Sequence, residues 1–234
     1  MNEEHRKRLL QIGSAAAFLA IVAVAVAVVI TQSQSDGGDT KLEDVATVNR
    51  ELQGIPQSGM TLGREDAPVT LVEFGDLQCP ACKGFAEGIV PELIASKVRG
   101  GEAKIEFRNF AILGEDSVSA GAAAVAAGQQ GRGWYFVELF YRNQGLEGSG
   151  YVTDEFLTEI ARGAGVQDIA RWNKDRKDQA GSLREVQRSS EEAERLGLTG
   201  TPSFAVFGPE SDGTEVLGTP GSAGVLEEAI EAAG

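Results

Sequence analysis

Two cysteines stand close together in the segment Cys79-Pro80-Ala81-Cys82, and the chain has no others. Thiols at this spacing can close into a disulfide and reopen by thiol-disulfide exchange, and a C-x-x-C pattern near a strand and a helix is typical of redox sites. A zinc site needs four ligands, and the single histidine, His5, lies far away. A structural disulfide is the alternative, but a ring this short removes little entropy from the unfolded chain. The pattern therefore favours redox chemistry.

The cysteines lie where a predicted strand becomes a predicted helix. Apolar residues are dense from Val69 to Phe74, and helical spacing begins at Phe85. Cys79 then falls at the N-cap, with Pro80 at the first helical position, where proline is favoured. Unpaired N–H groups and the helix dipole stabilise a thiolate at this end, so we expect a lowered pKa for Cys79. Cys82, one turn further in, can close the disulfide.

The composition is that of a folded, acidic protein. Hydrophobic residues make up 42% of the chain and charged residues 24%, which excludes a disordered class. The formal net charge of -14 argues against a nucleic-acid partner, because phosphate binding needs a basic surface. The length allows one domain with appendages.

An apolar run from Leu9 to Ile30 is about long enough to span a bilayer as one helix. A cleaved secretory signal is the alternative, but its apolar region is shorter and ends at a small-residue cleavage site, which residues 28–32 do not offer. Basic residues precede the run at positions 6–8 and only Lys41 follows closely. The positive-inside rule then leaves residues 1–8 in the cytoplasm and the rest outside, so we expect a single-pass protein of the cell membrane.

Residues 31–58 are polar and glycine-bearing, so we expect a tether with at most a short helix between Lys41 and Gln53. A catalytic domain of residues 59–234 would follow. Outside the cytoplasmic membrane disulfides form and persist, which suits the redox interpretation of the cysteine pair.

The segments Leu62 to Thr70, Val72 to Asp76 and Cys79 to Cys82 resemble the opening of the DsbA-like thiol-disulfide oxidoreductases of the thioredoxin superfamily. Gly200 to Phe204 resembles the loop that carries the cis-proline of that family. The similarity covers the chain from about Gly59 to its end. It implies an α/β thioredoxin-like fold with a helical insertion at about residues 115–197, where the apolar spacing is compatible with several helices.

Aromatic residues gather in the predicted insertion. They could line a peptide groove, but a cluster of this kind is more often core, and we expect it to fill the insertion. The aromatic members are Trp134, Phe136, Phe140 and Phe156, and Leu139 lies among them in the sequence.

The resemblance also implies roles for individual residues. Glu73 matches a buried acid beneath the active site that relays a proton to or from Cys82, although an edge strand would leave it in solvent. Pro202 matches the cis-proline, although without the resemblance an ordinary trans turn would be preferred. Thr201 would offer its backbone to an extended substrate, and we expect Pro80 and Ala81 to contact the substrate as well.

The function that this implies is donation of disulfides to exported proteins with reduced cysteines, without a bound cofactor or metal. Reoxidation by a quinone-linked membrane partner is implied by the family alone. A tethered reductase or isomerase, or a non-catalytic chaperone-like domain, would use the same scaffold. The best-known oxidases carry a histidine where this chain has Ala81, which has no donor or charge. Lys83 can help a thiolate and Asp76 can oppose it, so we predict an oxidant weaker than the strongest of the family.

Overall fold

The computed structural model describes residues 42–234, and of residues 212–217 the backbone only. The predicted cytoplasmic segment, membrane anchor and first part of the tether lie outside this range. Within it, every helix is too short or too polar to cross a bilayer.

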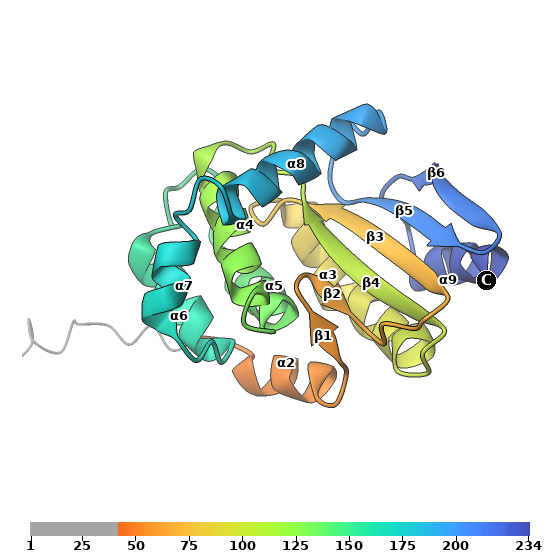
Figure 1. Ribbon diagram of the computed structural model, residues 1–234, viewed down its shortest axis with the longest axis horizontal. Coiled ribbons are helices and arrows are strands. Elements are labelled where there is room, and N and C mark those ends of the chain that lie inside the picture. Colours follow the sequence, from red (N-terminus) through yellow and green to blue (C-terminus); the bar gives the residue numbers. More distant parts are fainter. Residues whose placement is uncertain (1–41) are drawn as a thin grey trace, which may run out of the picture. The chain divides into compact units, whose positions relative to one another are not determined.

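One six-stranded sheet forms the centre of the fold, in the order β1-β2-β4-β3-β5-β6 (Figure 1). The central strands β3 and β4 run parallel, and their neighbours pair antiparallel. The strands are β1 (Gln57–Ser58), β2 (Thr61–Leu62), β3 (Val69–Gly75), β4 (Ala103–Asn109), β5 (Ser203–Gly208) and β6 (Ser211–Leu217).

Helices cover the sheet and fill one long connection. Between β3 and β4 the chain forms α3 and the π-helix η1, and α9 follows β6 and packs against α3 and β5. The stretch from α4 to α8 separates β4 from β5, which confirms the predicted helical insertion. The helices are α2 (Val45–Leu52), α3 (Pro80–Leu93), η1 (Ile94–Val98), α4 (Glu115–Gly128), α5 (Gly133–Arg142), α6 (Asp154–Gly163), α7 (Ile169–Asp175), α8 (Ser182–Arg195) and α9 (Ala223–Ala233).

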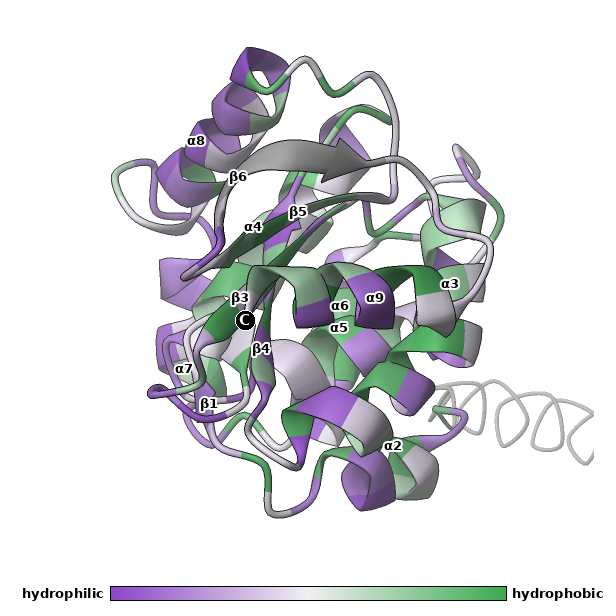
Figure 2. Cartoon of the chain, turned by 90° about the vertical axis from the view of Figure 1, so that its right-hand side faces the viewer, coloured by the Kyte–Doolittle hydropathy of each residue, from purple (hydrophilic) through white to green (hydrophobic). Residues whose placement is uncertain are grey.

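Strand β3 is central and buried on both faces. Alternate side chains of a strand point to opposite faces. Leu71 joins the main core with α3, α5 and α9, whereas Val72 and Phe74 join a smaller cluster with Ala193 of α8. Glu73 therefore faces the main core. In Figure 2, β5 and α3 are largely apolar, while α8 is mostly hydrophilic and keeps only one side against the fold.

The aromatic residues of the insertion are core, as predicted. Phe136 and Phe140 are fully buried on α5 and lie 6.2 Å apart between ring centroids. Phe156 of α6 packs on Phe140 edge to face at 5.3 Å. Trp134 is buried as well, and its indole N–H donates to the carbonyl oxygen of Met60 at 2.8 Å.

The predicted domain boundary at residue 59 is wrong, because the folded unit begins at Leu42. Helix α2 falls within the predicted short helix and buries Val48 and Leu52 in the main core. Strand β1 pairs with β2, where Gln57 lies opposite Leu62. Helix α2 buries only two residues, and strand β1 is only two residues long. The apolar periodicity of this polar stretch is therefore too weak to predict that it belongs to the domain.

We expect Leu52→Ala to lower the free energy of unfolding by about 3 kcal/mol, because the side chain is 0% exposed and its removal leaves a cavity. Urea denaturation of both proteins measures this difference. Leu146→Ala is the matched control, since Leu146 is 79% exposed and its loss should change stability by less than about 0.5 kcal/mol. Equal effects of the two substitutions would contradict the revised boundary.

Candidate active site

Cys79 caps the N-terminus of α3, as predicted. Strand β3 ends at Gly75, and Cys79 follows in extended conformation (φ -73°, ψ 121°) directly before Pro80, the first residue of the helix. The Cys79 side chain is partly exposed, whereas Cys82 is 0% exposed. Both are free thiols in this structure. An attacking group can therefore reach only Cys79.

The loop before β5 contacts Cys79, although the two segments are far apart in the sequence. The Thr201-Pro202 peptide bond is cis, as predicted, so the ordinary trans turn is excluded. The thiol of Cys79 donates to the carbonyl oxygen of Thr201 at 3.4 Å, although the two residues are 122 positions apart. Thr219 Oγ1 donates to the carbonyl oxygen of Pro202 at 3.2 Å and braces the loop. Antiparallel pairing of β3 with β5 brings these segments together.

The two sulfurs have opposite acid-base properties. A hydrogen bond with the Cys82 side chain lowers the pKa of Cys79 to about 5, helped by the Thr201 side chain and by the nearby backbone amides of Cys82 and Ala81. No side-chain hydrogen bond to a helix amide caps α3, so the helix terminus acts on the sulfur through its field. Burial raises the pKa of Cys82 well above its usual value, as do Cys79 and the charge of Glu73. Cys79 is thus the thiolate and Cys82 keeps its proton.

Glu73 is 2% exposed on the central strand, which excludes the solvent-facing alternative. Burial raises the pKa of its carboxyl group to about 8, and the charge of Glu138 adds to this. Its own charge raises the pKa of Cys82, so the two groups lie within electrostatic reach. A carboxyl group with a pKa near neutrality can give and take protons at working pH.

The other predicted site residues lie on the surface beside the sulfur. Pro80 and Ala81 are exposed, and Thr201 is partly exposed. Lys83 forms an ion pair with Glu87 at 3.7 Å on the exposed side of α3. The charge of Lys83 is thus shared with a carboxylate rather than directed to Cys79 alone.

Asp76 has a structural role that the sequence did not reveal. Its side chain is 1% exposed, and its Oδ1 accepts from the backbone N–H of Gln78 at 2.9 Å. Its Oδ2 accepts from the N–H groups of Ile112 and Leu113 at 2.8 and 3.0 Å. Instead of simply opposing the thiolate, this carboxylate fixes the loop that carries Cys79 to the start of the insertion.

Three further polar side chains hold the same loop. Gln78 is 1% exposed, and its Nε2 donates to Ser117 Oγ at 3.2 Å. Gln144 Nε2 donates to the carbonyl oxygens of Leu77 and Cys79 at 2.7 and 3.2 Å. The buried Tyr141 hydroxyl donates to the carbonyl oxygen of Asp76 at 3.2 Å. Their partners are remote in sequence, so no motif predicts these hydrogen bonds; Gln78 is distinguished only by its place directly before Cys79.

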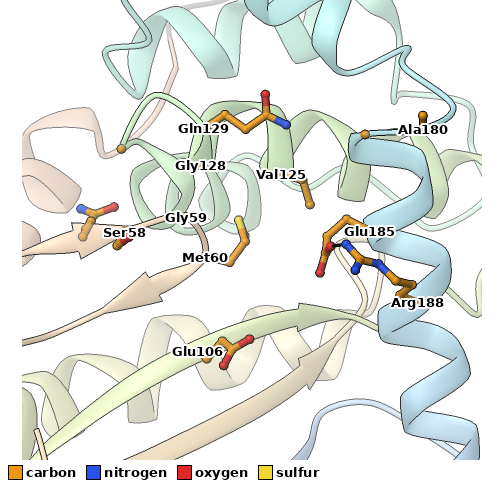
Figure 3. A pocket seen from close by; sticks show the side chains of 13 residues that line it. Ser58, Gly59, Met60, Glu106, Val125, Gly128, Gln129, Ala180, Glu185 and Arg188 are labelled. Atoms are coloured by element: carbon orange, nitrogen blue, oxygen red, sulfur yellow. Dashed lines mark hydrogen bonds and ion pairs between the residues drawn. The ribbon is translucent and has the colours of Figure 1, made fainter. Parts of the chain in front are cut away.

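A cavity of about 650 Å³ lies away from the cysteines, where the turn between β1 and β2, α4 and the start of α8 meet (Figure 3). Met60 and Val125 point toward it, and Glu185 and Arg188 form an ion pair at its edge. None of the predicted site residues lines it. The reactive sulfur instead lies at the protein surface, which suits a macromolecular substrate.

We expect the Cys79 thiol to titrate near pH 5 in the reduced protein, against about 8.5 in the unfolded chain. A lowered pKa favours the ionised form, so the stability of the reduced form relative to the oxidised form rises from about pH 5 to about pH 8.5. That gain is lost as pH falls through 5. Thiolate absorbance gives the midpoint, and denaturation of both redox forms gives the stability difference. A midpoint near 8.5 would contradict the geometry of the site.

Known proteins are similar to this chain in sequence and in fold. A family model described as thioredoxin matches residues 56–216. A probable disulfide bond formation protein D from Bacillus cereus is 32% identical over 152 residues, which cover 63% of this chain and 69% of that protein. The structure of BdbD from Bacillus subtilis in its oxidised form aligns with a TM-score of 0.65 at 25% identity, over 75% of this chain and 96% of that one. The structure of α-DsbA1 from Wolbachia pipientis shares the fold at 17% identity, with a TM-score of 0.62 over 78% and 92% of the two chains.

Proposed function

Because this chain belongs to the thioredoxin family and is a DsbA-like thiol-disulfide oxidoreductase, we propose that it donates disulfides to exported proteins through Cys79 and Cys82. The observation that carries this proposal is the contrast between the two sulfurs. Cys79 is accessible and has a pKa near 5, while Cys82 is fully buried and keeps its proton. The relatives named as disulfide bond formation proteins support the same direction of transfer.

In the first step, a substrate thiolate attacks Cys79 Sγ in the Cys79-Cys82 disulfide. A mixed disulfide forms, the bond between the two cysteines breaks, and its electron pair goes to Cys82 Sγ. Cys82 is a poor leaving group as a thiolate, because its pKa is raised. A proton from the carboxyl group of Glu73 therefore assists its departure and leaves Glu73 ionised.

In the second step, the other thiol of the substrate loses its proton and attacks the substrate's own sulfur in the mixed disulfide. The substrate disulfide forms, and Cys79 leaves as a thiolate. Its low pKa speeds this departure. Two electrons have passed from the substrate to the cysteine pair, which ends reduced.

Substrate recognition would use main-chain contacts at Thr201 together with the surface of Pro80 and Ala81. Thr201 lies two residues before the first residue of β5 and is partly exposed, so an extended peptide can pair with its backbone. Pro80 and Ala81 directly follow Cys79 in the chain and are exposed. Main-chain contacts depend little on the side chains of the substrate, which suits an enzyme that acts on many unfolded proteins.

Placement outside the cytoplasm is part of the proposal. It is supported by the apolar run from Leu9 to Ile30 and the basic residues before it. A membrane partner linked to quinones would accept the electrons of the reduced pair, as in the family. A membrane-tethered reductase or isomerase would use the same residues, and its redox potential would differ from that of a disulfide donor.

Labelling of intact cells tests the placement. After mild reduction, a membrane-impermeant thiol reagent should modify the full-length chain at Cys79, and the Cys79→Ser variant should stay unlabelled because Cys82 is buried. Labelling only after the cells are permeabilised would overturn the proposed location. Oxidation of a reduced, unfolded secretory protein by the purified full-length chain tests the activity.

A further inference from the structure

A second buried acid lies next to the site that the mechanism describes. Glu138 is 2% exposed in the aromatic helix α5, and its Oε1 has no hydrogen-bond partner. Among the residues that the structure describes, four buried side-chain atoms lack such a partner, and one of the others is Glu73 Oε1. Unpartnered carboxylate oxygens are costly to bury, so two of them in one region call for an explanation.

The two acids lie across the same packed interface. A Cβ placed on Gly75 would lie 3.1 Å from the Tyr141 hydroxyl, which shows that α5 packs directly on β3 there. Glu73 is two residues before Gly75 and shares its face of the strand. Glu138 is three residues before Tyr141 and shares its face of the helix. Both carboxyl groups therefore project into the space between β3 and α5.

From Glu138, a short series of charged groups leads to the surface. Arg142 Nη2 lies 3.7 Å from Glu138 Oε2 and 2.6 Å from Glu51 Oε2. The Glu51 side chain on α2 is 25% exposed, and Asp44 lies 3.7 Å from Arg142 beside it. The contacts of Arg142 with Glu138 and Glu51 thus connect the buried Glu138 to a partly exposed side chain.

Charged groups on four elements act on Glu138. Burial raises the pKa of its carboxyl group to about 8, Arg142 on its own helix lowers it, and Glu51 of α2 and Glu87 of α3 raise it. Glu73 faces it from β3. The net effect keeps a proton on the carboxyl group near neutral pH, where an ordinary glutamate has lost it.

We propose that Glu138 is the second carboxyl group of a proton path, which exchanges protons between Glu73 and the solvent on the side of Arg142 and Glu51. This inference rests on the proposed function, because a proton must reach Cys82 whenever the disulfide is reduced. A purely structural ion pair is a weaker account of Glu138. Arg142 already binds Glu51 at 2.6 Å, and at 3.7 Å Glu138 adds little while leaving Oε1 unpartnered.

The proton balance of the path is simple. Cys82 takes a proton from the Glu73 carboxyl group as the disulfide opens, and Glu73 becomes a carboxylate. Glu138 then gives its proton to Glu73 and becomes a carboxylate beside Arg142. A proton from solvent then restores Glu138, while Arg142 stays a guanidinium and supplies only the positive charge that stabilises the transient Glu138 carboxylate. Oxidation of the cysteine pair reverses each transfer.

The test compares Glu138→Gln with Glu92→Gln, which removes the same charge from an exposed site of α3. Reduction of the disulfide in the full-length protein by a dithiol peptide is followed in a single turnover from pH 5 to 9. Dividing the variant rate by the wild-type rate at each pH cancels the effect that titration of the peptide thiols has on both rates. We expect Glu138→Gln to be about tenfold slower at pH 7 and Glu92→Gln to match the wild type.

The pH profile separates proton transfer from a structural role. Glu73 must be protonated to act, so the rate falls as pH rises through its pKa. The Glu138 charge raises that pKa, and its removal should move the fall to lower pH. Glu51→Gln, at the exposed end, should slow the reaction but shift the pH at which the rate falls by less than Glu138→Gln does. It also supplies a second variant if Glu138→Gln does not fold.

Time-resolved infrared difference spectra recorded during reduction of the disulfide give a direct readout. We expect two carboxylic acid bands to be lost transiently and then regained, one absent in Glu73→Gln and the other absent in Glu138→Gln. The proposed path would be overturned if Glu138→Gln showed the same rates, pH profile and carboxylic acid bands as Glu92→Gln. If the wild type fails to oxidise the peptide, the proposed function falls, and time-resolved spectra during chemical reduction still decide whether Glu138 gives up and regains a proton.

Discussion

Replacing Cys79 by serine is expected to reduce disulfide donation to the background rate. A serine hydroxyl forms no disulfide, and the remaining thiol, Cys82, is 0% exposed with a raised pKa. Neither the mixed disulfide with the substrate nor the stored disulfide can then form. Oxidation of a reduced protein substrate, followed by the loss of free thiols, measures the change.

Cys82→Ser is the matched variant and should behave differently. It keeps the accessible Cys79 thiolate, which can attack the disulfide of an oxidised substrate, but it lacks the Cys82 thiol that would resolve the mixed disulfide. It should therefore accumulate mixed disulfides with the oxidised substrate in a non-reducing gel. Both variants should fold, because each change replaces only sulfur by oxygen. Substantial activity in Cys79→Ser would contradict the mechanism and favour a chaperone-like role for the scaffold.

Asp76→Ala is expected to lower the free energy of unfolding by about 4 kcal/mol. The buried carboxylate accepts hydrogen bonds from the N–H groups of Gln78, Ile112 and Leu113. Removing it leaves these donors without their partner, and each buried unpaired group costs about 1 to 3 kcal/mol, partly relieved by local movement. Urea denaturation of the reduced protein measures the loss.

The same variant should disturb the chemistry of the site. The loop that carries Cys79 would lose its tie to the insertion, so the pKa of Cys79 should rise toward its ordinary value. Asp66→Ala is the control, because Asp66 is exposed and pairs with Arg64 at the surface. It should leave both stability and thiolate titration close to those of the wild type. Matching results for the two variants would show that Asp76 does not hold the loop.

The parts of the site that lie inside compact motifs could be predicted from the sequence. Cys79 and Pro80 fall at a junction of strand and helix that apolar spacing reveals, and the resemblance to a family supplied Glu73 and Pro202. Burial of Glu73 could not be derived, because alternation along β3 does not say whether the opposite face is covered. That depends on α5 packing over it, which is a property of the folded chain.

The hydrogen bonds that join the helical insertion to the active-site loop could not be predicted from the sequence. Asp76 and Leu113 are 37 positions apart, and Gln144 is 65 positions from Cys79. Such pairs are set by how the insertion docks on the sheet. Glu138 was visible as a lone charge within an aromatic helical pattern, although the sequence does not show what neighbours it.

The most direct test of the central claim is the equilibrium reduction potential of the full-length protein in glutathione buffers at pH 7. Disulfide donation predicts a value of about -120 to -180 mV, within the range of known oxidants and isomerases. Because the pKa of Cys79 is about 5 rather than about 3.5, we expect the less oxidising end of that range. A value near about -270 mV would contradict donation and make the protein a reductase.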